Sequence, residues 1–217
     1  MKGTVNFLVL VLLIVNCSAL DAYDPVTHRE IAHRAARPPV SSVDDVLKSE
    51  LGLKEGIQET FPGISEAGQR TVEQLIGDGA LFEDVPNTRS LNHFHNPLRP
   101  WGEAGLRTFS VLGVPLLRGQ SSVLWQQNTS QDTTFVSTPV PLLSGGGNWS
   151  WQDARRHYLN ALTHPNKLDR DTAFANTFEA LGRLTHLPQD ASVPAHVRND
   201  LHPRPLGNPD WTEGWKL

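Results

Sequence analysis

The chain has almost no cysteine, and this limits the kinds of site that it can build. Among its 217 residues the single cysteine is Cys17, inside an apolar N-terminal run. Lipid attachment at Cys17 is one interpretation, but Asn16 stands where such sites usually carry a small residue. The rest of the chain has no thiol, so it forms no disulfide and binds no metal through sulfur. Any metal site must therefore use His, Asp and Glu.

An excess of positive charge is also missing. The formal net charge is −4 at pH 7, and Lys and Arg form no extended run. Tight, non-specific binding of duplex DNA requires dense positive charge and is therefore not expected. A nucleic acid bound through metal ions remains compatible with this composition.

Long apolar runs are missing beyond the N-terminus. Residues 7–15, Phe-Leu-Val-Leu-Val-Leu-Leu-Ile-Val, follow Lys2 and precede small residues that end at Ala22. This pattern is typical of an export signal and is too short to span a bilayer. We expect residues 1–22 to be a signal peptide, and the protein to be exported to the periplasm or the extracellular space. Residues 23–217 are expected to form a single helical domain.

The patterning of the remaining chain is mainly helical. Residues 84–100 contain three prolines and predict a loop, and residues 101–147 predict a long irregular excursion. No pair of strands stands out, so we expect an all-α fold. Capping residues and apolar spacing predict helices over residues 26–36, 43–51, 65–82, 121–127, 151–162 and 169–186, with Ser65 opening the third and Asp169 capping the last.

The most informative segment is His-Leu-Pro-Gln-Asp-Ala-Ser-Val-Pro-Ala-His over residues 186–196. His186 and Asp190 are four residues apart, so on a helix they share one face, and His196 can reach in from the next segment. Imidazole nitrogens and carboxylate oxygens suit zinc, and a carboxylate can bridge two metal ions. Pro188 lies between His186 and Asp190 and should kink the helix.

Further candidate ligands lie in short, separated segments. His28 is close to the expected mature N-terminus, Asp84 follows a predicted helix, and His93 lies within Asn-His-Phe-His-Asn-Pro over residues 92–97. His95 is an alternative to His93, because an extended segment would point only one of them inward. Ligands spread in this way are what a multi-metal site in a helical bundle requires. Three other histidines are interpreted as surface or hydrogen-bonded residues: His33, His157 and His164.

These segments resemble those of the zinc-dependent phospholipase C and single-strand nuclease superfamily, all-helical enzymes with a three-zinc site. The resemblance covers most of the chain after residue 22 and is strongest over residues 182–196. Residues 92–97 are more similar to the phospholipase branch than to the nuclease branch, which usually has Leu-His-Tyr there. The resemblance implies an all-α domain of the phospholipase C/nuclease type. Because such enzymes continue into further helices, we expect this domain to be C-terminally short.

The resemblance also implies a set of ligands for up to three zinc ions. The first zinc would be held by Asp84, His93, His186 and Asp190. Asp190 would bridge to a second zinc, bound by His28 and by the mature N-terminal residue, which is Tyr23 if cleavage follows Ala22. The third would be held by His196, Glu213 and a further histidine, for which His202 is the candidate because Pro209 stands at the expected position. Tyr23 also departs from the family, whose members usually begin with tryptophan.

The expected function is that of a secreted, zinc-dependent phosphoric-ester hydrolase, phospholipase C-like, which cleaves a phosphodiester with zinc-activated water. Asp84 is the expected catalytic residue, orienting or deprotonating that water. We expect a monomer that acts on a phospholipid or another phosphodiester and contacts a membrane surface transiently. Trp101 and Trp125 could line a lipid-facing cleft or belong to the core.

Two alternatives stay open. A single-strand nuclease would use the same ligands and would need an aromatic pocket that stacks a base. A degenerate relative would bind one or two zinc ions for stability alone, without an open coordination position.

Overall fold

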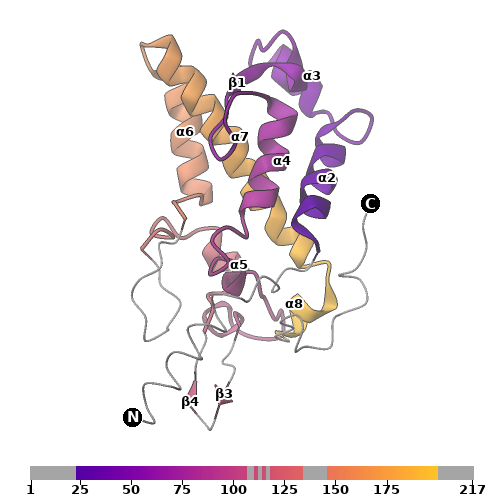
Figure 1. Cartoon of the computed structure of the whole chain (residues 1–217), viewed down its shortest axis with the longest axis vertical. Coiled ribbons are helices and arrows are strands. Elements are labelled where there is room, and N and C mark those ends of the chain that lie inside the picture. The colour runs from indigo at the N-terminus through magenta and orange to yellow at the C-terminus, as the bar shows by residue number, and fades with distance from the viewer. Residues whose placement is uncertain (1–22, 107–109, 112–113, 116–117, 134–145, 200–217) are drawn as a thin grey trace.

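The computed structural model describes residues 23–106, 110–111, 114–115, 118–133 and 146–199. The expected signal peptide, with Cys17, lies outside the described residues, as do His202 and Glu213. Figure 1 shows the described chain in colour.

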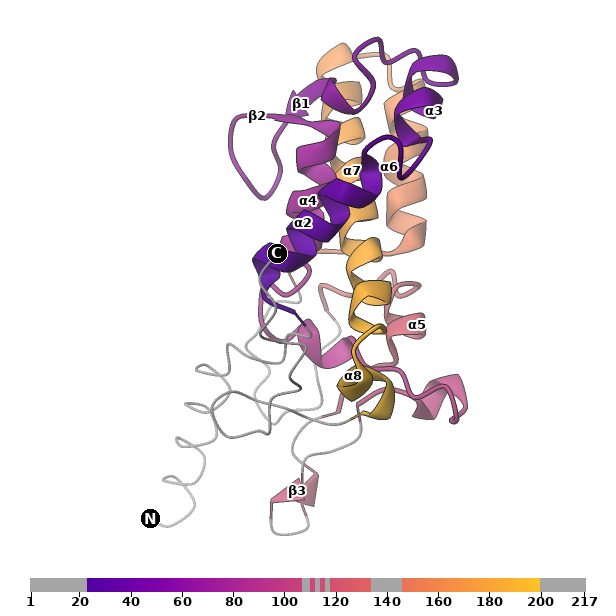
Figure 2. The same cartoon turned by 90° about the vertical axis from the view of Figure 1, so that its right-hand side faces the viewer.

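The described part of the chain is mostly helical, which confirms the helical class. The longest helix, α7, packs against α4 on one side and α6 on another, and α2 packs on α4. Figures 1 and 2 show these helices as an upright bundle, with α5 and α8 near one end of it. The helices in chain order are α2 (Pro25–Ala36), α3 (Val43–Ser49), α4 (Val72–Phe82), α5 (Ser122–Trp125), α6 (Trp151–Thr163), α7 (Lys167–Asp190) and α8 (Pro194–Arg198).

Short turns and strands complete the described elements. Residues 84–100 form a loop, as predicted, and contain the 3₁₀ turn η2 (Ser90–Asn92). The other turns are η1 (Gly56–Gln58) and η3 (Trp101–Glu103). Two short antiparallel hairpins that did not stand out in the sequence are also present: β1 (Thr60–Pro62) with β2 (Gln69–Thr71), and β3 (Ser110–Val111) with β4 (Val114–Pro115).

The predicted helix start at Ser65 is wrong, and the β1–β2 hairpin explains why. The N–H of Gly63 donates to the carbonyl of Gly68, which has φ +95°, a conformation that suits a turn and not a helix. Helix α4 begins only after Thr71. The Thr71 hydroxyl accepts from the N–H of Gln74, whose side chain accepts from the N–H of Thr71, forming a capping box.

Helix α7 is longer at both ends than predicted. Its cap is Asn166, whose side chain accepts from the N–H of Leu168, and not Asp169. At its other end the helix continues through Pro188 to Asp190. A proline in the last turn removes one hydrogen bond, and the turn here persists without it.

The apolar core lies between α2, α4, α7 and the β1 hairpin. The ring of Phe61 on β1 lies 5.3 Å from that of Phe174 and 5.9 Å from that of Phe178, both on α7. Burying each such side chain stabilises the fold by about 1.5–3 kcal/mol. Leu75 of α4, fully buried, belongs to the same core.

Two glycines allow α4 and α7 to approach closely. A Cβ on Gly79 would lie 2.0 Å from the carbonyl oxygen of Glu179, and one on Gly182 would lie 2.0 Å from that of Ile76. Only glycine permits this contact between backbones. It brings the end of α4 beside the last turns of α7, where the candidate ligands lie. Among the described residues, no helix is both long and apolar enough to cross a membrane.

Candidate metal centre

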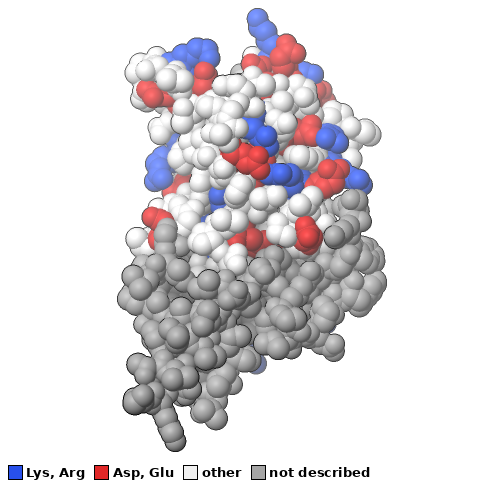
Figure 3. All heavy atoms as spheres, viewed as in Figure 1, with Lys and Arg blue, Asp and Glu red and all other residues white. Residues whose placement is uncertain are grey.

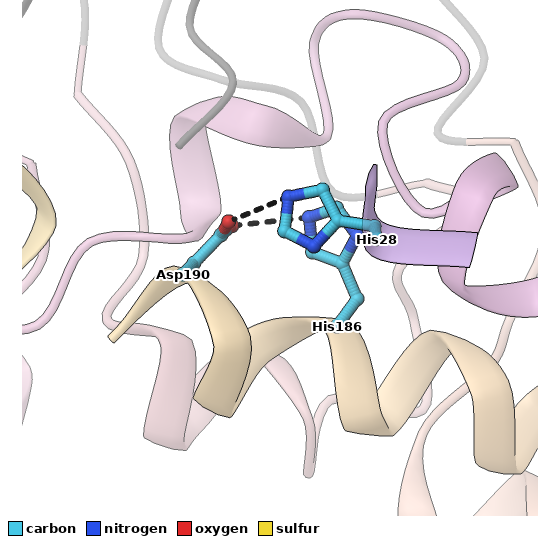
Figure 4. Close-up of side chains that lie close together, drawn as sticks. All are labelled: His28, His186 and Asp190. Carbon is cyan, nitrogen blue, oxygen red and sulfur yellow. Dashed lines mark ion pairs between the residues drawn. The ribbon is translucent and has the colours of Figure 1, made fainter. Parts of the chain in front are cut away.

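The last turns of α7 carry the centre of the site. His186 and Asp190 are both fully buried and lie on one face of the helix, with His186 Nε2 3.1 Å from Asp190 Oδ2. Figure 4 shows the two side chains projecting from the helix toward His28. The predicted pairing at i and i+4 is therefore present.

Helix α2 brings His28 to the same point. Its Nε2 lies 3.2 Å from Asp190 Oδ1, and its ring stacks on that of His186 with centroids 3.8 Å apart. The start of α2 is set by Asp24, which accepts from the N–H of Val26, so His28 lies in the first turns of this helix. The Nδ1 of His28 lies 2.8 Å from the Oε1 of Gln189.

The loop after α4 supplies Asp84 and His93. His93 Nδ1 lies 2.7 Å from Asp190 Oδ2 and 3.3 Å from Asp84 Oδ1, and Asp84 Oδ2 lies 3.6 Å from His186 Nε2. Asp84 and His93 are both buried. Of the two histidines in this loop, His93 points to the site. His95 instead contacts the hydroxyl of Ser121 through Nδ1, at 2.8 Å.

His196, the first of the third expected ligand set, lies at the edge of the cluster. It is fully buried on α8, and its ring stacks on Phe94 with centroids 4.3 Å apart. Its Nδ1 lies 3.8 Å from Asp190 Oδ2 and 3.4 Å from the carbonyl oxygen of His93.

Two groups of side chains have ligand atoms within 4.8 Å of one another: His28, His186 and Asp190, and Asp84, His93 and His186. His186 belongs to both of these groups. The resemblance assigns it to the first zinc only. His186 Nδ1 lies 2.6 Å from the carbonyl oxygen of Ala80, which leaves Nε2 as its inward atom. Tyr23 lies next to the first group, its ring 5.5 Å from that of His28 and its hydroxyl 3.1 Å from Ser192 Oγ.

The inward atoms fit a metal ion because they are buried and face one another, with no hydrogen-bond partner outside the cluster. They are His28 Nε2, His93 Nδ1, His186 Nε2 and both carboxylate oxygens of Asp190. Leaving a buried polar atom unsatisfied costs about 1–3 kcal/mol, and charged groups cost more. Divalent cations held by these two groups would accept the lone pairs of the five atoms. A set of nitrogen and oxygen donors without sulfur suits zinc.

Burial lowers the pKa of the histidines in the cluster, whereas the carboxylate of Asp190 raises it. Burial lowers the pKa of His186 to about 4, although Asp190 opposes this, so this imidazole is neutral and can bind a metal. Burial also lowers the pKa of His93, but hydrogen bonding to Asp190 and its charge outweigh burial and raise that pKa to about 10. Burial raises the pKa of Asp190, but the imidazoles that surround it, those of His186 and His196 first, outweigh burial and hold that pKa well below its usual value.

Residues that sequence reasoning did not single out surround the centre. The most prominent is Glu83, directly before Asp84 and 2% exposed. Arg89 and Trp125 donate hydrogen bonds to its carboxylate. Burial raises the pKa of Glu83, but the charges of Arg89 and His93 outweigh it and hold that pKa well below its usual value. The signal available in the sequence was an acidic pair at the end of an apolar helix.

The two tryptophans considered as cleft or core residues differ in exposure. Trp125 is buried and belongs to the core, whereas Trp101 is 57% exposed. The three histidines given no role are indeed outside the cluster: His33 packs on Gly77, His157 lies on α6, and His164 pairs with Asp169. Comparison with protein-family models, with curated proteins and with solved structures gave no match.

Proposed function

We propose that this chain is an exported, monomeric, zinc-dependent phosphodiesterase of the phospholipase C/nuclease type. The observation that carries the proposal is the environment of Asp190. Its two oxygens lie within 3.2 Å of imidazole nitrogens from α2, from the loop after α4 and from α7 itself. A buried carboxylate shared by imidazoles from separate elements suits a bridge between metal ions. The side chains that would hold zinc are His28, Asp84, His93, His186, Asp190 and His196.

The protein's own groups have distinct tasks in such a reaction. Bound zinc ions would polarise the phosphoryl oxygens and lower the pKa of water to near neutrality. Asp84 is the residue we propose to orient that water and accept its proton, because it is a carboxylate within the cluster, 3.3 Å from His93 Nδ1 and 3.6 Å from His186 Nε2. The fully buried imidazoles and Asp190 exclude water from the rest of the centre.

A phospholipid is the substrate class that we propose. Supporting it, the segment that follows His93 exposes two large apolar side chains, Leu98 at 90% and Trp101 at 57%, with Arg99 between them. Exposed apolar side chains beside a cationic one are typical of contact with a lipid surface. Single-stranded nucleic acid is the competing substrate.

The direct test removes and restores zinc. The purified full chain would be stripped with a chelator, reloaded with zinc, and assayed on bis-p-nitrophenyl phosphate, phosphatidylcholine vesicles and single-stranded DNA. We expect diester hydrolysis to disappear with the metal and to return with zinc, and phosphatidylcholine to be preferred over DNA. Asp190→Asn should reduce hydrolysis by about 100-fold or more. His157→Ala should leave it unchanged, since His157 is a half-buried histidine on α6.

Each contrary result has a definite meaning. Hydrolysis that survives metal removal contradicts the mechanism. Preference for DNA favours the nuclease alternative. Zinc that binds tightly without hydrolysis of any of the three substrates favours a purely structural role.

A further inference from the structure

Glu83 occupies a rigid and fully buried position at the end of α4. Arg89 Nη2 donates to both of its oxygens, at 2.9 and 2.8 Å, and Trp125 Nε1 donates to Oε1 at 2.8 Å. Arg183 of α7 approaches the same carboxylate, with Nη1 3.7 Å from Oε2. None of these three partners is a candidate ligand. The carboxylate is therefore fixed in place independently of any metal.

His93 lies between this carboxylate and the candidate metal centre. Its Nε2 is 3.7 Å from Glu83 Oε1, and its Nδ1 is 2.7 Å from Asp190 Oδ2. A metal bound at Nδ1 leaves the ring proton on Nε2, where it faces Glu83. The outward nitrogens of His28 and His186 meet neutral oxygens instead, those of Gln189 and of the Ala80 carbonyl. Of these three histidines, only His93 faces a carboxylate on its outward side.

We propose that Glu83 is a positioning residue that acts through His93. Its negative charge, 3.7 Å from Nε2, favours the ring proton on that nitrogen, orients the imidazole and strengthens Nδ1 as a donor to zinc. An acceptor behind a metal-binding histidine fixes its tautomer and raises its basicity, and its loss typically costs 10–100-fold in metal affinity. The inference rests on the proposed function, because it requires that the centre binds zinc.

The competing explanation is purely structural, with Glu83 present only to neutralise the buried Arg89 and Arg183. Glu179 distinguishes the two explanations, because it is also fully buried and also pairs with Arg183, at 3.2 Å. Its other partner is Ser65, which donates to it through both N–H and hydroxyl. In the described part of the chain it contacts no candidate ligand. Glu179→Gln is therefore a matched control for Glu83→Gln.

The experiment measures the zinc affinity of the full chain by competition with a chromophoric chelator, so no substrate is needed. Glu83→Gln should weaken the tightest zinc by about 10–100-fold and shift the visible spectrum of the cobalt-substituted protein. Glu179→Gln should lower the melting temperature but keep the zinc affinity within about twofold of the wild type. Glu83→Asp keeps a negative charge for Arg89, so this variant should fold. Its shorter side chain moves the carboxylate away from His93 Nε2, so it should bind zinc more weakly than the wild type.

A double-mutant cycle tests whether the effect passes through His93. In a His93→Ala background, Glu83→Gln should cause no further loss of zinc affinity, because the ring that it supports is gone. Equal zinc affinity in Glu83→Gln and the wild type, or full additivity with His93→Ala, overturns the role of Glu83 and leaves the proposed function intact. A wild-type chain that binds no zinc overturns both.

Discussion

At the scale of single residues, Asp190 is the group on which the cluster depends. Replacing it with asparagine keeps the shape but removes the charge that three imidazoles face at 3.2 Å or less. We expect Asp190→Asn to lose bound zinc and to reduce diester hydrolysis by about 100-fold or more, since a metal ligand is removed. Elemental analysis of the purified variant measures the metal content.

The control for this substitution is Asp153→Asn. Asp153 is also a buried aspartate, but it belongs to the capping box of α6 with Ser150. Its loss should cost about 1 kcal/mol of stability and leave zinc content unchanged. Equal zinc content in Asp190→Asn and the wild type would contradict the assignment of Asp190 as a bridge.

His93 makes the stability of the metal-free protein depend on pH. Its pKa in the folded state is about 10, above the usual 6.5, so the protonated ring stabilises the fold fully below pH 6.5. This contribution is lost as pH rises from 6.5 through 10. Urea unfolding of the metal-free chain across this range should show the decline, and His93→Ala should reduce it. Zinc affinity should rise over the same range, because binding must displace the proton from Nδ1.

At the scale of elements, the contact between α4 and α7 determines whether Asp84 reaches the ligands on α7. Gly79→Ala and Gly182→Ala would each place a Cβ 2.0 Å from a backbone carbonyl of the other helix. The helices must move apart, which typically costs about 1–3 kcal/mol. We expect a lower melting temperature and weaker zinc binding in both variants. Gly102→Ala has open space around its Cβ and should change neither.

The sequence predicts these helices where local signals act alone. The Asp24 cap and the spacing of His186 and Asp190 each produce the expected structure, because capping and helical periodicity are local. The start of α4 also had a local signal that the prediction missed, because Thr71 and Gln74 have the spacing of a capping box and the apolar stripe begins only at Val72. The role of Glu83 had no such local signal, since its partners Arg89, Trp125 and Arg183 come together only in the folded chain.

At the scale of the whole molecule, charge does not direct the protein to a polyanion. On the described face in Figure 3, basic and acidic side chains are intermingled, and the net charge is −4. Contact with a lipid surface would therefore depend on exposed apolar side chains more than on long-range attraction. Leu98 and Trp101 are two exposed apolar side chains in the segment that follows the candidate ligand His93.

The proposed lipid contact predicts a difference between substrates that are presented on vesicles and those that are soluble. Leu98→Ser should lower hydrolysis of phosphatidylcholine vesicles about tenfold, because burying a leucine is worth about 1.5–3 kcal/mol. Hydrolysis of soluble bis-p-nitrophenyl phosphate should not change, since the side chain is 90% exposed and outside the ligand cluster. Trp101→Ser should behave in the same way. Leu168→Ser is the control: Leu168 is 67% exposed at the start of α7, about 33 Å along the helix from Asp190. A loss as large with Leu168→Ser as with Leu98→Ser would rule out a specific lipid contact beside the metal centre.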